Sequence, residues 1–597
     1  METTAMRTLA TLLLCALMTP AQSDGAASTT SKPPRSKKAG RVIHELKMSG
    51  AYMDLPGAAL DIASLVGLGA TGKPKPFYTL VDDLAKVEGG AILVDLSDLG
   101  LSLNGPQLTE LERAFTALRD RGVHATAYLE NASMAHYRAA MLCDKVVLAD
   151  MGMLDFRSPA MGSMFFKGVM DLLGVEVQVT RCGDFKGAVE PFLLERMSDH
   201  LKLHYEKMLT SMNDHIVNSI AARRGLAAEK VRALQKRRMF DAEAAKAAGL
   251  VDEIVPWRGA RFSVATDDDT TFKNVGKKEK KGGISLMSLL SGGSTASKMR
   301  IGKDSVVVLQ LSGTITDGKT ASPGSMVSGP TVALIRELAE HKKVKGVVVR
   351  VNSPGGSATA SEAILLALRD LAKAKPTVVS MGDLAASGGY YISMIGKDCK
   401  VFAEAETITG SIGVFGMRPN VKELADALGV HQELVTLDPD AAGMDDLFSP
   451  LSDTQLNRLQ DMVDGVYTRF QDRILEARKM SREDLLKIAG GRVWSGTQAK
   501  ELGLVDALGG LGAAMATIEP EAGAGHAVVH FPKPDSNPLG ALGSLLGAHL
   551  RSAETRLTIL SQAGFKLEGP LRILLDALRN PRANRAWMMI PAELRIR

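Results

Sequence analysis

The sequence has few cysteines, little net charge and no long apolar segment. Only four cysteines occur among 597 residues and none forms a C-x-x-C pair, so neither a zinc ribbon nor a redox motif is supported. The formal net charge of +5 is small for this length, which argues against a nucleic-acid-binding protein. The 45% hydrophobic and 23% charged residues are ordinary globular values. They indicate a folded chain of about three to five domain-sized units.

The apolar run near the N-terminus is too short for a membrane span. Leu9–Met18 covers ten residues and follows Arg7, whereas a span needs about 20. Small residues precede a plausible cleavage point at Asp24. The pattern predicts a cleaved export signal over residues 1–23, in preference to a retained anchor, and the leucine before Cys15 disfavours lipidation.

The body of the chain is an internal duplication. A shift of 254 pairs Ser133 with Ser387, and the same shift pairs AKAAGLVD (245–252) with AKELGLVD (499–506). Two matches at one offset indicate two repeats. The predicted organisation is a tether at 24–40, a first repeat at 41–257, a linker at 258–300, a second repeat at 301–520 and a tail at 521–597.

Each repeat alternates strand and helix patterns. Short β-branched runs predict strands at 305–311, 344–351 and 377–380, and an apolar run predicts another at 91–96. Helical spacing predicts helices at 107–121, 331–341 and 361–373, and long helical stretches at 196–235 and 450–490. Strands that alternate with helices indicate an α/β fold with largely parallel sheets.

Two motifs resemble ligand sites, but the residues around each motif argue against such a site. Gly67–Lys73 matches G-x-G-x-x-G, but Pro74 and Pro76 forbid the helix that would hold the phosphates, so a loop is expected. His200 and His204 have the spacing of a metal pair, but no third ligand is evident. We therefore expect two surface histidines and no metal.

Two glycine-rich turns follow consecutive predicted strands, and the second carries a serine. The first is Asn352–Ser357, with Gly355 and Gly356 after a buried strand; the second is Asp383–Tyr390, with Ser387 before two more glycines. Ligands bind at the carboxyl ends of such strands, and glycines there let backbone N–H groups face an oxyanion. A serine at a helix start is usually an N-cap, but the paired turns make Ser387 a candidate nucleophile. None of the 11 histidines lies in a motif aimed at it, which leaves a lysine as the alternative base.

Five segments resemble the signatures of one peptidase family. They are VNSPGGS (351–357), SMGDLAASGGYYIS (380–393), TGSIGVFG (409–416), RCGDFKGAVEPF (181–192) and RVWSGTQAKELGLVD (492–506). Residues 41–515 thereby resemble the long, two-repeat form of the signal peptide peptidase A family, serine peptidases of family S49. The resemblance implies tandem duplicated crotonase/Clp-protease-like domains built on ββα repeats.

The resemblance also implies a role for each site residue. Ser387 is the expected nucleophile, Lys186 the general base and Ser411 the residue that orients the lysine. Backbone N–H groups of Gly356 and Gly388 are the expected oxyanion hole, and neither a metal nor a cofactor is implied.

The duplication independently favours one composite site. The second repeat has Ala442 where the first has Lys186, and the first repeat lacks the glycines that follow Ser387. Neither repeat alone holds a complete site, so the economical interpretation takes the lysine from one and the serine from the other.

Two other function classes stay open at this stage. A crotonase-type acyl-CoA enzyme would use the same oxyanion turns with a carboxylate acid/base, for which Asp383 is the nearby candidate. A catalytically inactive, peptide-binding scaffold would need neither the lysine nor the serine.

The family resemblance further implies partners and a location. It implies that the substrates are peptides such as cleaved signal peptides and unfolded chains. It also implies a homotetramer in the bacterial periplasm, associated with the periplasmic face of the inner membrane. No nucleic-acid partner is expected.

Overall fold

The computed structural model covers most of both halves of the chain. It describes residues 41–54, 74–264, 270–276, 301–322, 324–438, 444, 446–523 and 525–532, and the backbone of 587–589. The predicted signal segment and tether, the Gly67–Lys73 loop and Ala442 lie outside the described residues. From Val42 onward the described residues belong to one compact unit.

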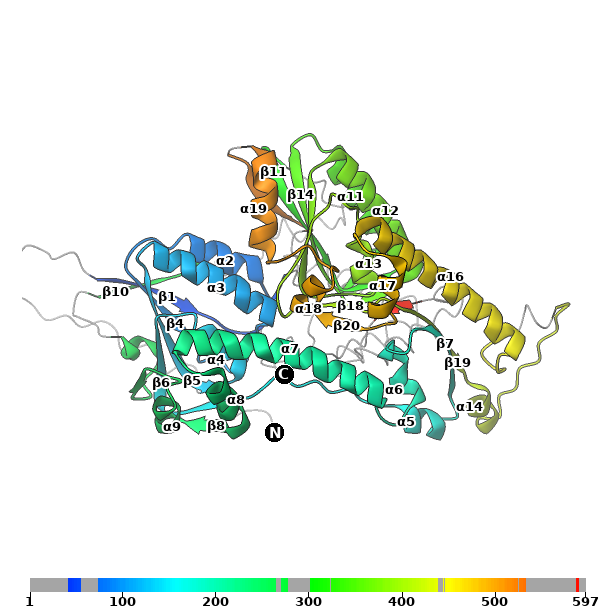
Figure 1. The fold of residues 1–597 in the computed structure, drawn as a ribbon, viewed down its shortest axis with the longest axis horizontal. Helices are drawn as coiled ribbons and strands as arrows, with labels where there is room; N and C mark the ends of the chain where they lie inside the picture. The colour runs from blue at the N-terminus through cyan, green and yellow to red at the C-terminus, as the bar shows by residue number, and fades with distance from the viewer. Residues whose placement is uncertain are drawn as a thin grey trace, which may run out of the picture. The chain divides into compact units, whose positions relative to one another are not determined.

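The first half folds around a mostly parallel sheet (Figure 1). The strand order is β10-β1-β4-β5-β6-β8, with β9 also paired to β6, and within this sheet only β6 and β8 run antiparallel. The strands are β1 (Val42–Lys47), β4 (Ala91–Asp95), β5 (His124–Ala132), β6 (Lys145–Phe156), β8 (Arg238–Asp241), β9 (Glu253–Val255) and β10 (Thr271–Asn274). The main helices are α2 (Phe77–Ala85), α3 (Gly105–Asp120), α4 (Met134–Ala140), α7 (Asp199–Arg224), α8 (Ala228–Arg237) and α9 (Ala242–Ala247).

The second half repeats this plan. Its strand order is β20-β18-β16-β14-β11-β22, with β17 (Val401–Ala403) and β21 (Ala507–Leu508) attached beside β16. The six strands of this order are β11 (Ser305–Ser312), β14 (Val344–Ser353), β16 (Thr377–Ala386), β18 (Ile408–Gly410), β20 (Val493–Ser495) and β22 (Ala527–Phe531). The helices include α11 (Ser328–Glu340), α12 (Ala358–Ala374), α13 (Gly388–Ile392), α16 (Asp453–Ala477), α17 (Arg482–Ile488), α18 (Gly496–Glu501) and α19 (Leu511–Ala522).

A third sheet connects the two halves. Its order is β13-β12-β15-β23-β19-β7, where β7 (Glu176–Cys182) comes from the first half and β19 (Val414–Asn420) from the second. The two strands pair antiparallel along their whole length and lie side by side in Figure 1. The other members are β12 (Thr314–Thr316), β13 (Ser325–Val327), β15 (Gly355–Ser357) and β23 (Trp587–Met589). The β7–β19 pairing places the segment that follows β7 beside the second half.

Equivalent contacts in the two halves confirm the duplication. In each repeat, the aspartate of the matched GLVD segment accepts hydrogen bonds from a buried backbone N–H and from an arginine. The partners are Val146 N and Arg224 for Asp252, and Val401 N and Arg478 for Asp506.

Several elements differ from the sequence prediction. Helix α12 begins at Ala358 rather than at Ser361, because Ser357 caps it by accepting a hydrogen bond from the Ala360 N–H. Strand β16 continues to Ala386, past the predicted end at Ser380. Strand β10 pairs with β1 inside the stretch predicted as a linker.

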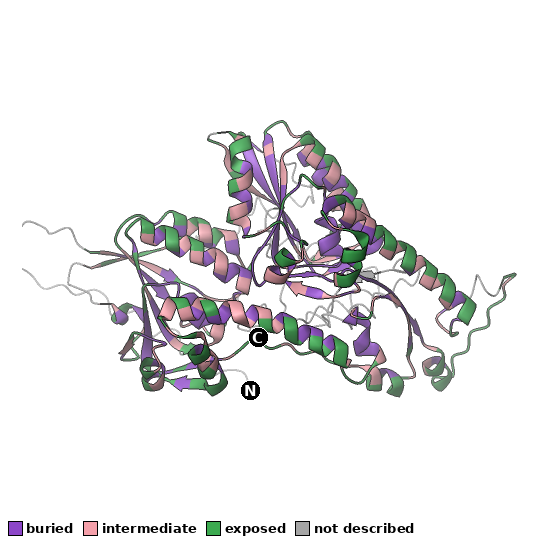
Figure 2. Ribbon diagram, viewed as in Figure 1, coloured by how far each residue is buried: buried purple, intermediate pink, exposed green. Residues whose placement is uncertain are grey.

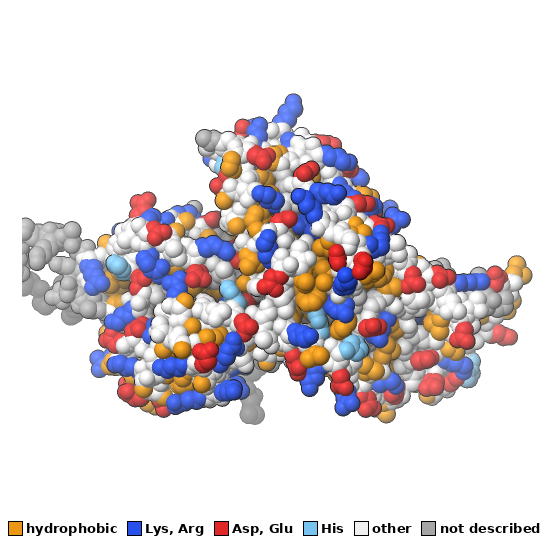
Figure 3. All heavy atoms as spheres, viewed as in Figure 1, with side chains coloured by type: hydrophobic (Ala, Val, Ile, Leu, Met, Phe, Trp, Pro, Cys, Tyr) orange, Lys and Arg blue, Asp and Glu red, His pale blue; other side chains and the backbone are white. Residues whose placement is uncertain are grey.

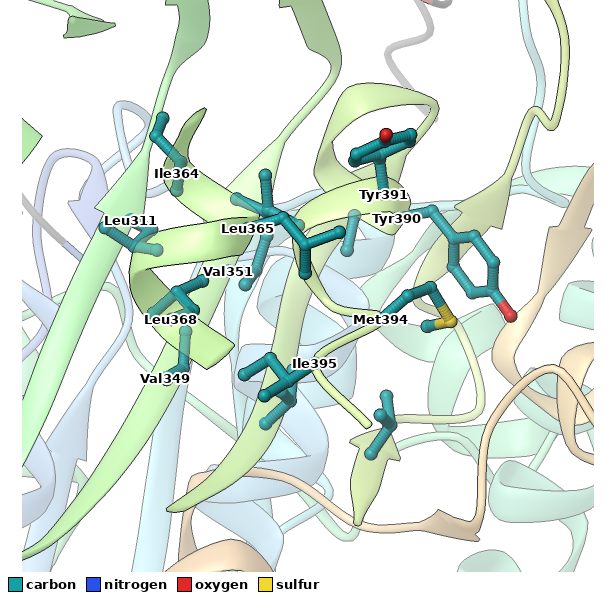
Figure 4. Close-up of a cluster of buried hydrophobic side chains, with 14 of the residues drawn as sticks. Leu311, Val349, Val351, Ile364, Leu365, Leu368, Tyr390, Tyr391, Met394 and Ile395 are labelled. Atoms are coloured by element: carbon teal, nitrogen blue, oxygen red, sulfur yellow. The ribbon is translucent and has the colours of Figure 1, made fainter. Parts of the chain in front are cut away.

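The core of the second half lies between its central strands and helices α12 and α13. Leu311, Val349, Leu365, Tyr390 and Met394 are among its buried side chains (Figure 4). Along the central strands the residues are buried on both faces, while the helices keep an exposed side (Figure 2). This explains the continuous valine runs of these strands, since a parallel sheet covered on both faces needs apolar residues at every position.

The surface shows no large region of one charge sign on the face in Figure 3. Basic and acidic side chains are interspersed there, in keeping with the small net charge. Within the described ranges, no helix combines the length and apolar character needed to span a bilayer.

Buried ion pairs connect the two halves near β14 and β16. Arg350, 2% exposed, lies 2.9 Å from a carboxylate oxygen of Asp54 and 2.9 Å from one of Glu110, both from the first half. Two further pairs take the arginine from the first half and the carboxylate from the second: Arg138–Glu406, which is buried, and Arg113–Glu404, whose arginine is partly exposed. A buried ion pair adds little net stability, but breaking one leaves an uncompensated charge away from water.

Arg350→Met is therefore expected to destabilise the fold by about 3–5 kcal/mol, because two buried carboxylates lose their counter-charge. The exposed pair of Arg232 and Asp214 provides the control, since Arg232→Met should change stability by less than about 1 kcal/mol. Urea unfolding of both variants measures the difference. Equal stability of the two variants would contradict the role given to Arg350.

Candidate active site

Ser387 occupies a strained turn between β16 and α13. Its backbone has φ 55° and ψ −115°, a conformation that costs a non-glycine residue about 1–3 kcal/mol. Its N–H donates to the Gly410 carbonyl at 2.8 Å, and its hydroxyl makes no helix-capping hydrogen bond. The serine is therefore not an ordinary N-cap, and its hydroxyl is available for another partner.

Lys186 reaches Ser387 from the other half of the chain. It follows β7 and immediately precedes the short 3₁₀ helix Gly187–Val189. The Lys186 Nζ lies 2.7 Å from the Ser387 Oγ, although the two residues are distant in sequence. The structure thus brings the predicted base and the predicted nucleophile into hydrogen-bond contact.

Ser411 holds the lysine amine from a second side. Its Oγ is 2.9 Å from Lys186 Nζ, and its carbonyl oxygen accepts a hydrogen bond from the same nitrogen at 3.0 Å. Ser411 also has a positive φ, 52°, in the turn between β18 and β19. Two contacts from one residue fix where the amine points.

Burial determines the protonation of Lys186. Its side chain is fully buried, and desolvation lowers its pKa well below the ordinary value. The hydroxyls of Ser387 and Ser411 can hydrogen-bond a neutral amine without supplying the negative charge that would favour the ammonium form. The arrangement therefore suits a lysine that is neutral and able to accept a proton.

The predicted oxyanion residues also lie together. A Cβ added to Gly388 would be 3.1 Å from the backbone nitrogen of Gly356, so the two backbones are in close contact. A Cβ at Gly356 would lie 1.9 Å from the carbonyl oxygen of Ile315. The collision with Ile315 and the positive φ of 155° require glycine at Gly356, and the close packing brings the backbones of the two predicted oxyanion residues together.

The equivalent serine of the first half has a different environment. Ser133 is an N-cap with an ordinary φ of −80°, and its Oγ lies 2.7 Å from Nδ1 of His136. The His136 Nε2 is 2.9 Å from the Asp98 carbonyl oxygen. No motif had pointed to this histidine, whose spacing from Ser133 is that of a capping box.

The two histidines on α7 do not form the predicted surface pair. His204 is buried, with Nε2 2.8 Å from the Val493 carbonyl oxygen, because α7 packs against β20. His200 instead approaches the carbonyl oxygen of Asp184 at 2.9 Å. Across the ranges that the structure describes, no cluster of three or more His, Cys, Asp or Glu side chains could hold a metal.

Asp383 belongs to the charge cluster between the halves. Burial, together with the carboxylates of Asp54 and Glu406, raises its pKa to about 7. It is the carboxylate that an acyl-CoA enzyme would use, but the groups that perturb it are those of the ion-pair cluster.

Comparisons with known proteins identify the family. The model of peptidase family S49 matches residues 117–270 and 369–525, one segment in each repeat, and the model of the Clp protease family matches 324–410. Protease 4 of Haemophilus influenzae is 32% identical over 447 residues, which cover 73% of this chain and 71% of that protein. Protease 4 of Salmonella typhi is 31% identical over 429 residues, 70% of this chain and 67% of that protein. A chloroplastic serine protease SPPA of Arabidopsis thaliana is 28% identical over 436 residues, 71% of this chain and 62% of that protein.

These matches agree with the α/β fold, the duplication and the resemblance found in the sequence motifs. The chain belongs to peptidase family S49 and is a serine protease with two copies of the family's domain.

Proposed function

We propose that this chain is a serine endopeptidase that uses a Ser387–Lys186 dyad to degrade exported peptides such as cleaved signal peptides. The observation that carries the proposal is the 2.7 Å contact between Lys186 Nζ and Ser387 Oγ, where burial lowers the pKa of the amine well below its ordinary value. A serine hydroxyl is a weak nucleophile until an adjacent base takes its proton, and this contact supplies such a base.

The reaction then follows from the positions of the groups. Lys186 accepts the Ser387 hydroxyl proton as Oγ attacks the scissile carbonyl carbon. The N–H groups of Gly356 and Gly388 stabilise the resulting oxyanion. The lysine ammonium next donates its proton to the leaving amine, which breaks the peptide bond and leaves an acyl-serine. A water molecule then attacks this ester as the same lysine takes its proton, and the lysine ammonium returns a proton to Ser387 Oγ as the ester bond breaks, while Ser411 keeps the amine aligned throughout.

The pairing of strand β23 within this chain supports the proposal that substrates bind in an extended conformation. The backbone of β23 pairs antiparallel with β15, placing Met588 opposite Gly356, and Trp587 also pairs with Phe415 of β19. Main chain in a β conformation therefore fits beside the oxyanion turn. Substrates are proposed to bind there by strand addition, which admits unfolded peptides and excludes stably folded proteins.

The test is cleavage of a synthetic signal peptide by the wild-type protein and by Ser387→Ala. Loss of cleavage in the variant, with serine-directed fluorophosphonate labelling of the wild type alone, is the expected result. Cleavage that survives in Ser387→Ala would show that Ser387 is not the nucleophile, whereas a wild type that converts an acyl-CoA and does not cleave the peptide would favour the acyl-CoA class of chemistry. A wild type that binds peptide but is neither labelled nor active would favour the scaffold.

We also propose a periplasmic location, attachment to the periplasmic face of the inner membrane, and a homotetramer. These follow from the family resemblance and from the export signal predicted over residues 1–23. Cell fractionation tests the location, and light scattering of the purified protein tests the assembly. A cytosolic fraction or a monomeric mass would refute the respective proposal.

Removal of the residues after Pro532 should strengthen peptide binding. In this proposal β23 occupies the edge of β15 that a substrate strand needs, so an intact tail competes with substrate. We expect the truncated chain to have a KM lower by several-fold with kcat nearly unchanged. Steady-state kinetics with one fluorogenic peptide measures both, and an unchanged or higher KM would mean that β23 does not compete.

A further inference from the structure

The turn Gly490–Arg492 contacts both segments that form the lysine site. The carbonyl of Gly490 accepts a hydrogen bond at 3.0 Å from the N–H of Phe185, the neighbour of Lys186. The carbonyl of Arg492 accepts one at 2.6 Å from the N–H of Ser411. One short turn of the second repeat thus binds the base-bearing segment and the segment that orients the base.

Backbone packs directly on backbone at this point. A Cβ at Gly491 would lie 2.4 Å from the backbone nitrogen of Lys186 and 2.6 Å from its Cα. A Cβ at Gly183 would lie 2.3 Å from the carbonyl carbon of Gly490. These distances leave no room for a side chain, so the lysine backbone cannot shift toward the turn.

Side chains hold the turn itself in place. The Tyr467 hydroxyl accepts a hydrogen bond from the N–H of Gly490 at 3.2 Å. The Arg492 guanidinium stacks 3.8 Å from the ring centre of Phe185. The turn is therefore attached to α16 on one side and to the lysine segment on the other.

We infer that Gly490–Arg492 is a positioning element, which sets the Lys186 amine against Ser387 and Ser411 through its contacts with the Lys186 backbone and with Ser411. The inference rests on the proposed function, because it gives the lysine its role as base. Lys186 and Ser387 come from different repeats, so their spacing must be fixed by contacts that span the repeats. This turn makes such contacts with the backbone of Phe185 and Lys186 and with Ser411.

Gly491→Ala tests the inference, with Gly429→Ala, also in the second repeat but outside the turn, as its matched control. Both glycines have a positive φ, 87° and 70°, so alanine adds comparable strain at either. A Cβ at Gly429, however, would have no heavy atom within 4 Å. The two variants therefore separate the collision with Lys186 from the strain of an alanine at positive φ.

We expect Gly491→Ala to lower kcat by about 100-fold, as a displacement of about 1 Å of a reacting group can, with KM within about threefold. The pH midpoint of kcat/KM should also rise, because a displaced amine is more accessible to water. The titratable groups near this segment are Asp184, His200, His204, Tyr205, Tyr467 and Arg492, and the cause of the lowered Lys186 pKa is burial. Gly429→Ala should keep kcat within about threefold and keep the midpoint.

Identical kcat and pH midpoints for the two glycine variants would overturn the inference. If Gly491→Ala does not fold, Tyr467→Phe decides instead, since it removes only the hydroxyl that holds Gly490. The loss of one such hydrogen bond should lower kcat up to about tenfold and move the midpoint. Tyr137→Phe, which removes a buried hydroxyl bonded to the Leu250 carbonyl in the first half, should change neither. A Tyr467→Phe enzyme with unchanged kcat and midpoint would overturn the inference.

A failure of the proposed function would look different. In that case the wild type would not be labelled by fluorophosphonate, or Ser387→Ala would keep its activity. With both of those controls as expected, the glycine and tyrosine variants report on the turn alone.

Discussion

Replacement of either Ser387 or Lys186 by alanine is expected to abolish peptide cleavage while the protein stays folded. Each residue supplies a group without which the other cannot act, and removal of one member of such a unit typically costs about 10⁴- to 10⁶-fold in kcat. Peptide cleavage assays on both variants, with circular dichroism as a check of the fold, measure the effect. Neither change should unfold the chain, because removing the buried lysine amine also removes its desolvation cost.

The double variant sharpens this test. Residues that act as a unit are non-additive, so Ser387→Ala with Lys186→Ala should be no less active than either single variant. Ser133→Ala is the matched control, because Ser133 lies at the equivalent strand end of the first repeat but contacts His136 rather than a lysine. Loss of activity in Ser133→Ala together with an active Ser387→Ala would reverse the assignment.

The pH dependence of kcat/KM should reflect a Lys186 pKa far below the ordinary value for lysine. An exposed lysine has a pKa of about 10.4 and is almost fully protonated near pH 7. Burial disfavours the ammonium form, and complete burial can lower the pKa by up to about 3–5 units. Only the neutral amine can accept the Ser387 proton, so activity is low below the Lys186 pKa and high above it. We expect kcat/KM to rise with pH through one ionisation, with a midpoint well below 10.4.

Lys186→Arg tests whether Lys186 acts as a base or only supplies a positive charge. The guanidinium keeps the charge and most of the length but stays protonated at every accessible pH, so this variant should be inactive. Lys186→His should recover at most a trace of activity, with a shifted profile. A flat profile between about pH 5 and 10, or an active Lys186→Arg enzyme, would show that the lysine is not the base.

The sequence alone predicted the fold class and the duplication, and its motifs named candidate site residues that the structure brings together. Periodicity was sufficient for the strands because buried parallel strands are apolar at every position, as the valines of β11 and β14 show. The duplication appeared at one constant offset, and the GLVD segments contain the aspartates that make equivalent contacts in both halves. The motifs around Ser387, Lys186 and Ser411 named residues that the structure places within hydrogen-bond distance.

Element boundaries were less certain from the sequence, since hydrogen bonds that no pattern records decide where an element begins or ends. The cap of α12 lies at Ser357 because this residue lies at the end of β15 and its hydroxyl reaches the Ala360 N–H. His204 looked like a surface residue, because its burial depends on β20, which comes from the other repeat.

Only the tertiary structure decided how two incomplete repeats form one site. The sequence could place the lysine and the serine in different halves, but their contact depends on β7 crossing to pair with β19. It also depends on the turn Gly490–Arg492, whose backbone packs directly on the backbone of Lys186. This contact requires glycine because a side chain would not fit, and such a requirement does not appear in the sequence as a motif of reactive residues. The ion pairs of Arg350 with Asp54 and Glu110 have the same origin. Long-range contacts of this kind are set by the packing of the whole chain, whereas patterning and motifs are local properties of the sequence.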